Sequence, residues 1–408
     1  MYWHLALQRK TFSYPVIIMN QRQSVIHWIG AGLSSVPGIR YLAQTDRPLI
    51  VWNRTLQKAK DAIGNVDSST KARVFSQESL ESELAPGDVV VSMLPGDWHV
   101  PLAKVCIERN AHFVSSSYLT DEMRALNSDA SDKGLCLVNE VGLDPGIDHL
   151  MAHKLVNAYR NDPAYADDNI LSFRSYCGGF PAVANDFRYK FSWSPLGVLK
   201  ALKSPSRSIR EGAEYITQRP WHDIVEHNVH LGHGQETFEA YPNRDSLPFM
   251  KDYHFEPDWQ VNEFVRGTLR LQGWANAWKN IFNTIEQLEG PSGENTLKEM
   301  SKTLWQQYAY SDDEPDRVVL SVELQAQRDD VPVWHQAYAI DAVGNKESSA
   351  MGRLVSGTVA LAVEAVLDDR IANGVSAAPN DIELIDQWFD KYRQSGDMLN
   401  HLDLLKVL

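Results

Sequence analysis

Short apolar runs alternate with longer amphipathic stretches through the first third of the chain. The runs are apolar at nearly every position, which is typical of strands buried on both faces. The stretches between them repeat apolar residues every three to four positions, as a helix with one buried face does. The expected strands are 25–29, 49–52, 72–75, 89–93, 112–115 and 136–139, and the expected helices are 34–43, 56–63, 78–84, 100–109 and 120–132. This alternation predicts an α/β fold with a Rossmann-type, doubly wound parallel sheet.

The pattern changes after Asp148. A helical pattern over 148–159 leads into a polar, proline-containing segment, 161–169. The strand-like runs beyond it are separated by irregular, aromatic-rich segments and cover 171–177, 188–193, 264–272, 318–327 and 333–342. This arrangement predicts a second, α+β domain with a mixed, largely antiparallel sheet.

A helical pattern near the end of the chain, over 351–371, is rich in small and apolar residues on all sides. Such a helix is buried, so we expect it to pack back on the first domain. The expected divisions are an N-terminal extension (1–23), a dinucleotide-binding domain (24–150), a substrate-binding domain (151–345) and C-terminal helices returning to the first domain (346–408). The extension lacks the apolar core and cleavage site of a signal peptide. It is either a surface tail, or Met19 is the true start.

Composition narrows the classes of partner. The 408 residues are 43% hydrophobic and 23% charged, as in ordinary soluble proteins of two domains. A net charge of −14 disfavours nucleic acid and anionic membrane surfaces, and no apolar run approaches the roughly 20 residues of a membrane span. The three cysteines are far apart, and His230 and His233 lack a third ligand at zinc spacing. We therefore expect a reduced, cytoplasmic protein with no metal, nucleic-acid or membrane partner.

The first expected strand runs directly into Gly30-Ala-Gly32, and a helical pattern follows. In a dinucleotide site the first glycine makes the tight turn and the second lets a pyrophosphate approach the backbone. The third glycine of the usual Gly-x-Gly-x-x-Gly is replaced by Ser35, and Gly-x-Gly alone fits a simple turn equally well. The six alternating strands favour the dinucleotide site. Its expected contacts from this turn are Gly30, Gly32, Leu33 and Ser34.

The end of the second strand bears on the choice of cofactor. An acidic residue there binds a ribose 2′-hydroxyl, whereas a basic one accepts a 2′-phosphate. This chain has Asn53-Arg54-Thr55 and no carboxylate. The fork of donors on Arg54 suits a phosphate, and Asn53 and Thr55 add neutral donors. The sequence therefore predicts NADP(H) in preference to NAD(H), with a solvated surface arginine as the alternative.

Three further loops follow expected strands, at 92–96, 115–118 and 139–149. Ligands of an open parallel sheet bind outside the carboxyl ends of its strands, so we expect these loops to line the cofactor crevice. The serines at 115–117, and Asp144 or Asp148 in the third loop, are also suited to capping the helices that follow.

Several longer sequence motifs of this chain resemble those of one protein family. In order along the chain they are SSSYLTDEM from Ser115, GLCLVNEVGLDPGIDHLMA from Gly134, YCGGFPA from Tyr176, YKFSWSPLG from Tyr189, AYPNRDS from Ala240 and RGTLR from Arg266. In these motifs the chain is similar to the saccharopine dehydrogenase family, in particular its glutamate-forming branch, saccharopine reductase. The resemblance runs over 24–273. The chain departs from it in the glycine loop, at 204–212 and in the N-terminal extension.

The resemblance implies an NADP(H)-dependent oxidoreductase of lysine metabolism. It would act on the CH–NH bond of saccharopine and release L-glutamate and 2-aminoadipate 6-semialdehyde. The three carboxylates of that substrate need cations and other donors, which the family motifs place at Ser116, Ser117, Arg244, Thr268, Leu269 and Arg270. Further cofactor contacts are implied at Leu94, Leu143, Asp144 and Pro145, and the assembly is expected to be a homodimer.

Proton transfers at the amine and at the carbinolamine oxygen need acid–base groups. The resemblance implies Tyr118, Asp144 and Cys177. An ordinary Asp has a pKa of about 4, so Asp144 is expected to orient the cofactor or the amine rather than act as a strong base. Cys177 fits a buried structural cysteine nearly as well. Two other functions remain open: a related reductase forming carboxylated polyamines, which would need fewer arginines and more acids, and a sensor that binds NADPH without turnover.

Overall fold

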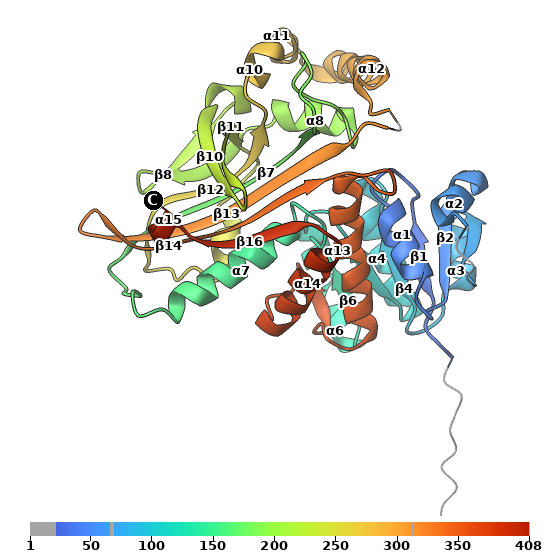
Figure 1. The fold of residues 1–408 in the computed structure, drawn as a ribbon. Coiled ribbons are helices and arrows are strands. Elements are labelled where there is room, and N and C mark those ends of the chain that lie inside the picture. Colours follow the sequence, from blue (N-terminus) through green and yellow to red (C-terminus); the bar gives the residue numbers. More distant parts are fainter. Residues whose placement is uncertain (1–21, 66–68, 312, 408) are drawn as a thin grey trace, which may run out of the picture.

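Two sheets organise the chain. The computed structural model describes residues 22–65, 69–311 and 313–407, so nearly all of the expected N-terminal extension lies outside the described residues. The first sheet and its helices form one half of the molecule and the second sheet forms the other (Figure 1).

The first sheet contains seven strands in the order β15-β6-β5-β4-β1-β2-β3, all paired in parallel. Their bounds are Ile26–Ile29 (β1), Leu49–Asn53 (β2), Lys71–Val74 (β3), Val89–Ser92 (β4), His112–Ser115 (β5), Cys136–Val138 (β6) and Gly374–Ser376 (β15). The predicted Rossmann-type sheet is therefore confirmed. The seventh strand, β15, was not predicted because three residues are too few to show a period.

Helices cover both faces of this sheet. One face carries α1 (Val36–Ala43), α2 (Leu56–Ile63) and α13 (Ala350–Leu367), and the other carries α3 (Gln77–Glu83), α4 (His99–Arg109), α5 (Asp121–Arg124) and α6 (Asn127–Asp132). Alternate strand residues serve the two faces: Trp28 packs with the first set and Ile29 with the second. The helix expected over 34–43 begins at Val36, and the one expected over 120–132 is divided into α5 and α6.

The second sheet contains nine strands and is mixed. Seven follow the order β10-β11-β12-β7-β13-β14-β16, and β8 and β9 lie off this path. Their bounds are Ile170–Pro181 (β7), Ser206–Arg210 (β8), Ala213–Thr217 (β9), Val225–Leu231 (β10), Gly234–Pro242 (β11), Gln260–Arg270 (β12), Asp316–Arg328 (β13), Val331–Val343 (β14) and Met398–Asp403 (β16). Only β12 and β7 pair in parallel, so the prediction of a largely antiparallel sheet is confirmed.

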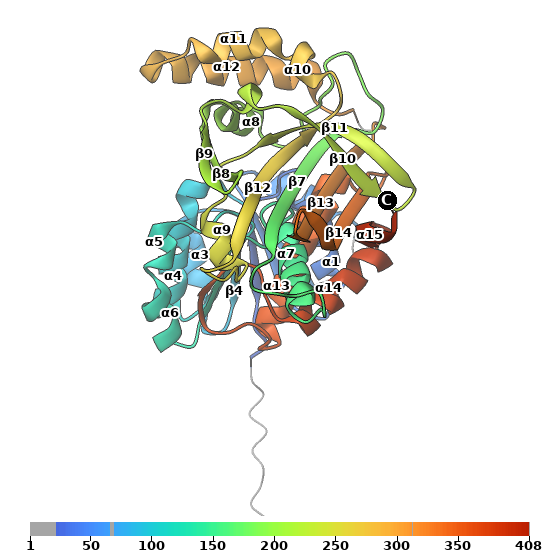
Figure 2. The same ribbon diagram turned by 90° about the vertical axis from the view of Figure 1, so that its left-hand side faces the viewer.

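The strand expected over 188–193 was wrong. Apart from one bridge between Phe191 and Ala309, this segment is irregular. Its alternating aromatics instead pack on Trp278, with ring centroids 5.5 Å (Tyr189) and 6.2 Å (Phe191) away. Helices α8 (Pro195–Lys203), α10 (Trp274–Ala277), α11 (Lys279–Glu286) and α12 (Gly290–Tyr308) lie at this end of the second sheet (Figure 2). Helix α9 (Pro248–Asp252) lies away from them, and its Phe249 packs in the cluster that contains first-sheet residues.

Helices α7 (Ile147–Arg160) and α13 and the last strand connect the two sheets. Helix α7 packs against β13 and β14, and the apolar α13 returns to α1, β4 and β5. After β15 and α14 (Ile382–Gln394), β16 pairs with β14, so the last strand joins the second sheet rather than the first domain. By length and composition alone one described helix, α13, can cross a membrane, and 67% of it is buried inside the structure.

Candidate active site

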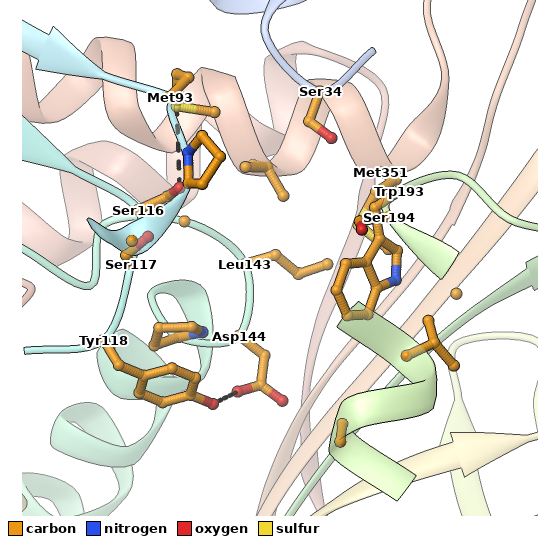
Figure 3. Close-up of a pocket in the computed structure, with 18 of the residues that line it drawn as sticks. Ser34, Met93, Ser116, Ser117, Tyr118, Leu143, Asp144, Trp193, Ser194 and Met351 are labelled. Atoms are coloured by element: carbon orange, nitrogen blue, oxygen red, sulfur yellow. Dashed lines mark hydrogen bonds between the residues drawn. The ribbon is translucent and has the colours of Figure 1, made fainter. Parts of the chain in front are cut away.

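A cavity of about 1210 Å³ lies between the carboxyl ends of the first-sheet strands and the second sheet (Figure 3). It exceeds the roughly 300–1,000 Å³ of a typical small-ligand pocket, so it has room for two ligands side by side. The expected site residues that line it are Gly32, Leu33, Ser34, Leu94, Ser116, Ser117, Tyr118, Leu143, Asp144, Pro145, Cys177, Arg244, Thr268 and Arg270. The expected residues outside this lining are Gly30, Asn53, Arg54, Thr55 and Leu269.

The glycine turn has the geometry that a pyrophosphate needs. Gly30 has φ +103°, and a Cβ added there would lie 3.0 Å from the carbonyl oxygen of Met93. This position therefore requires glycine although it does not line the cavity. At Gly32 an added Cβ would meet nothing within 4 Å, which leaves open space at the start of α1. A dinucleotide diphosphate fits this space, because backbone N–H groups at a helix start attract anions.

Arg54 lies just beyond the carboxyl end of β2, with its side chain exposed. Neither a hydrogen bond nor an ion pair engages it among the described residues. Its neighbours are locally paired, since the Asn53 side-chain amide donates to the carbonyl of Thr55 at 3.1 Å. A free guanidinium at the end of the second strand suits a ribose 2′-phosphate.

The serines after β5 are held by a histidine that the sequence reasoning missed. His99 lines the cavity, with Nε2 2.8 Å from Ser117 Oγ and Nδ1 3.0 Å from Ser92 Oγ. Burial lowers the pKa of His99 to about 4, so its imidazole is neutral near pH 7. Ser116 Oγ instead points at Met93 Sδ, 3.9 Å away. His99 thus fixes the hydroxyl of Ser117 beside the cavity.

Tyr118 and Asp144 meet at the floor of the cavity. The Tyr118 hydroxyl donates to Asp144 Oδ1 at 3.2 Å, and Arg266 Nη2 donates to the same oxygen at 2.7 Å. The second oxygen of Asp144 points away from Tyr118 into the cavity (Figure 3). Burial and the nearby Asp144 raise the pKa of Tyr118, so its hydroxyl keeps its proton.

Cys177 also lines the cavity, from β7. Burial raises the pKa of its thiol well above the usual range, and the charges of Asp144 and Asp148 act in the same direction. A thiol rather than a thiolate therefore faces the ligand space. This geometry makes Cys177 a weak nucleophile, because the thiolate is the reactive form.

Behind Asp144 lies a buried charged cluster. Arg266 Nη2 also donates to Asp148 at 2.6 Å, and His149 Nε2 lies 3.1 Å from Glu140. The Arg266 guanidinium is stacked 4.0 Å from the ring of Phe249. Arg266 is the first residue of the RGTLR motif, in which only Thr268, Leu269 and Arg270 were predicted to contact substrate.

Arg270 is a buried cation without a carboxylate partner among the described residues. The residue is only 6% exposed, and its Nη1 donates a hydrogen bond to the carbonyl of Leu269 at 3.1 Å. Three rings surround the guanidinium carbon, at 4.9 Å (Tyr189), 5.5 Å (Tyr241) and 5.3 Å (Trp274). A buried charge is costly unless paired, so this arrangement calls for an anion from a ligand.

The other expected substrate contacts differ in exposure. Arg244 is exposed, with φ +58° and its guanidinium carbon 4.6 Å from the centre of the Tyr118 ring. Thr268 lines the cavity beside Arg270. The Leu269 side chain is in an apolar cluster instead, because alternate residues of β12 face opposite sides of the sheet. Any contact of Leu269 with a ligand would therefore be through its backbone.

Comparison with known proteins identifies the family. Residues 26–138 match the saccharopine dehydrogenase NADP binding domain, and residues 142–397 match the saccharopine dehydrogenase C-terminal domain. A saccharopine dehydrogenase [NADP(+), L-glutamate-forming] of Pyricularia oryzae is 35% identical over 251 residues, which are 60% of this chain and 54% of that protein. An alpha-aminoadipic semialdehyde synthase of Arabidopsis thaliana is 35% identical over 238 residues, 57% of this chain and 22% of that protein. The matches thus span about half or less of these relatives.

Solved structures agree with the fold. The apo saccharopine dehydrogenase (L-Glu forming) from Saccharomyces cerevisiae superposes with a TM-score of 0.76 at 26% identity, covering 93% of this chain and 99% of that one. A homospermidine synthase from Legionella pneumophila shares the fold, with a TM-score of 0.63 at 10% identity, over 94% of this chain and 91% of that one. The chain therefore belongs to the saccharopine dehydrogenase family, and its two matched domains meet at the cavity.

Proposed function

We propose that this chain is an NADP(H)-dependent oxidoreductase acting on the CH–NH bond of saccharopine. Saccharopine, NADP⁺ and water would give L-glutamate, 2-aminoadipate 6-semialdehyde and NADPH, reversibly. Arg270 carries the proposal, because its buried guanidinium has no carboxylate partner among the described residues and faces the cavity. Saccharopine brings three carboxylates, and one of them would pair with Arg270. The exposed Arg244 at the cavity wall would meet a second.

The cofactor would lie along the carboxyl ends of the first-sheet strands. The open space at Gly32 would receive its diphosphate, and Arg54 would hold a 2′-phosphate. When bound, the nicotinamide supplies or accepts the hydride at the substrate carbon. Ser117, fixed by His99, lies in the lining of the same cavity.

A diamine substrate is less well supported. Diamines would bring ammonium groups close to the buried Arg270, and like charges repel. A sensor that binds NADPH without turnover would not need the part of the cavity lined by Arg270 and Asp144.

The test is an assay of the full chain with saccharopine and either NADP⁺ or NAD⁺. Formation of the reduced nicotinamide would be followed optically, and glutamate would be identified chemically. Turnover with NADP⁺, and slower turnover with NAD⁺, is expected. NADPH binding by calorimetry without turnover of saccharopine would support the sensor instead, and turnover only with a diamine and an aldehyde would support the polyamine reductase.

A further inference from the structure

Arg266 is shared by two aspartates. Its Nη2 atom lies 2.7 Å from Asp144 Oδ1 and 2.6 Å from Asp148 Oδ2. The side chain of Arg266 is 4% exposed, that of Asp148 is 0% exposed and that of Asp144 is 16% exposed. Water therefore screens these charges weakly, and one guanidinium cannot fully compensate two carboxylates.

The next shell adds another carboxylate and one imidazole. Glu140 lies 3.1 Å from His149 Nε2, and Asp148 lies 3.6 Å from His149 Nδ1. Three carboxylates thus face one guanidinium and one imidazole. Even with His149 protonated, one negative charge is left over in a buried cluster, which favours one protonated carboxyl.

The surroundings of the two aspartates decide which one keeps the proton. Asp148 accepts the backbone N–H of Gly146 at 2.7 Å in addition to its Arg266 bond. Asp144 Oδ1 takes the bonds from Tyr118 and Arg266, whereas its second oxygen has no partner among the described residues and faces the cavity. A proton on that oxygen is free to reach a ligand, whereas a proton on Asp148 would break a charge-assisted bond in the interior.

Other titratable groups face Asp144 from each neighbouring element. The charged ones are Glu140 after β6, Asp148 and His149 on α7 and Arg266 on β12. Arg244 after β11 lies over the Tyr118 ring and is exposed, so water screens its charge. The neutral ones are Tyr118 after β5, Cys177 on β7 and Tyr253 after α9. Burial and Asp148 raise the pKa of Asp144 against the opposing Arg266 and His149. Burial alone would raise the pKa of Asp148, but His149 and Arg266 outweigh it and lower that pKa.

We propose that Asp148 is a positioning residue: by holding Arg266, it leaves the proton on the cavity-facing oxygen of Asp144, which then acts as the acid for the substrate. This inference rests on the proposed function for the identity of the substrate. In the reductive direction Asp144 gives its proton to the carbinolamine oxygen. The carbon–oxygen bond breaks and its electron pair leaves with water, while the nitrogen lone pair forms the iminium double bond. Asp144 is left as a carboxylate, and in the oxidative direction it takes the proton back from the attacking water.

The proton on Asp144 can be observed without substrate. Infrared difference spectra of the full chain, wild type minus Asp144→Asn, should contain the carbonyl stretch of a carboxylic acid at pH 7. The same difference taken in an Asp148→Asn background should show a carboxylate at pH 7, because removing the negative neighbour favours ionisation. The titration midpoint should fall by about one pH unit or more. Asp148→Glu, which keeps the charge, should restore the acid band.

Asp88→Asn is the matched control. It removes a buried carboxylate outside the cluster, one that pairs with Arg22 and His27 and not with Arg266, so the acid band of Asp144 should remain. A carboxylate at Asp144 in the wild type at pH 7 overturns the proposal, and this measurement stands even if Asp148→Asn does not fold. An acid band that persists in folded Asp148→Asn overturns the role of Asp148. Failure of the saccharopine assay would leave these spectra unchanged, so the two proposals fail separately.

Discussion

Gly38 of α1 lies directly against Ser356 of α13. Its backbone N–H donates to Ser356 Oγ at 2.8 Å, and a Cβ added to Gly38 would lie 2.3 Å from the carbonyl oxygen of Ser356. In many dinucleotide sites the third motif glycine provides close packing of the helix. Here Ser35 occupies the motif position, and a glycine three residues later brings the returning C-terminal helix onto α1.

Replacing Gly38 by Ala should therefore destabilise the chain. Alanine inside a helix is ordinarily better than glycine by about 1 kcal/mol, so a loss would report the contact with Ser356. We expect the free energy of unfolding in urea to fall by about 1–3 kcal/mol, as for an overpacked core. Unchanged or increased stability would show that α13 moves aside at no cost.

Gly32→Ala, in the turn before α1, is the matched change with the opposite outcome. An added Cβ there meets nothing within 4 Å, so stability in urea should stay as in the wild type. The methyl group would occupy the space proposed for the diphosphate. The Kd of NADPH by calorimetry should rise about tenfold, the equivalent of one charge-assisted hydrogen bond. Unchanged NADPH affinity would place the diphosphate elsewhere.

Arg54→Asp should separate the two nicotinamide cofactors. Loss of a guanidinium–phosphate contact should weaken NADPH about ten- to hundredfold while NADH binding changes little. Arg109, ion-paired with Glu81 at 3.6 Å near the end of α4, is the control, and Arg109→Asp should leave both affinities unchanged. Equal losses for NADPH and NADH in Arg54→Asp would contradict the phosphate role.

Arg270→Ala should raise the KM for saccharopine about ten- to hundredfold, the worth of a hydrogen-bonded charge pair. Arg270→Lys keeps the charge but loses the fork of donors, so its KM should lie between the two. The Kd of NADPH is the internal control and should not change. A normal KM in a folded Arg270→Ala variant would remove the observation on which the proposed substrate rests.

Asp88 should contribute stability that acid removes. It accepts bonds from Arg22 Nη1 (2.7 Å), Val25 N (2.8 Å), Ala85 N (2.9 Å) and His27 Nε2 (3.3 Å). Burial alone would raise the pKa of Asp88, but the bonds from His27, Arg22 and the two backbone N–H groups lower it to about 2. The folded pKa thus lies below the unfolded value of about 3.9. The stabilisation is present above pH 4 and is lost as the pH falls toward 2.

The difference in the free energy of unfolding in urea between wild type and Asp88→Asn isolates this contribution, because the contributions of the other carboxyl groups cancel. This difference should shrink by about 2 kcal/mol between pH 5 and pH 2 as Asp88 becomes protonated. Parallel stability curves over this range would mean that Asp88 is not held as a carboxylate.

Most of the first sheet was predictable because strands such as β1, β2 and β4 are buried on both faces and are nearly continuous apolar runs. The strands β8 to β11 were not predicted: β9, for instance, has four exposed residues of five and shows little periodicity. At the site, the local sequence motifs around Asp144 and Arg270 were enough to predict these two as site residues. The pairing of Arg266 with Asp144 joins residues 122 positions apart, and such pairing leaves no local pattern.

The chain passes between the two sheets three times, after β6, after β14 and after β15, and the last stretch supplies β15 to one sheet and β16 to the other. The two halves are thus interlocked, and no single cut releases either as a complete unit. Any opening of the cavity must bend all three connecting segments together, so a hinge between the two halves consists of three segments of the chain. A fragment ending after β14 would leave bare backbone edges on β6 and β14, and such edges invite aggregation.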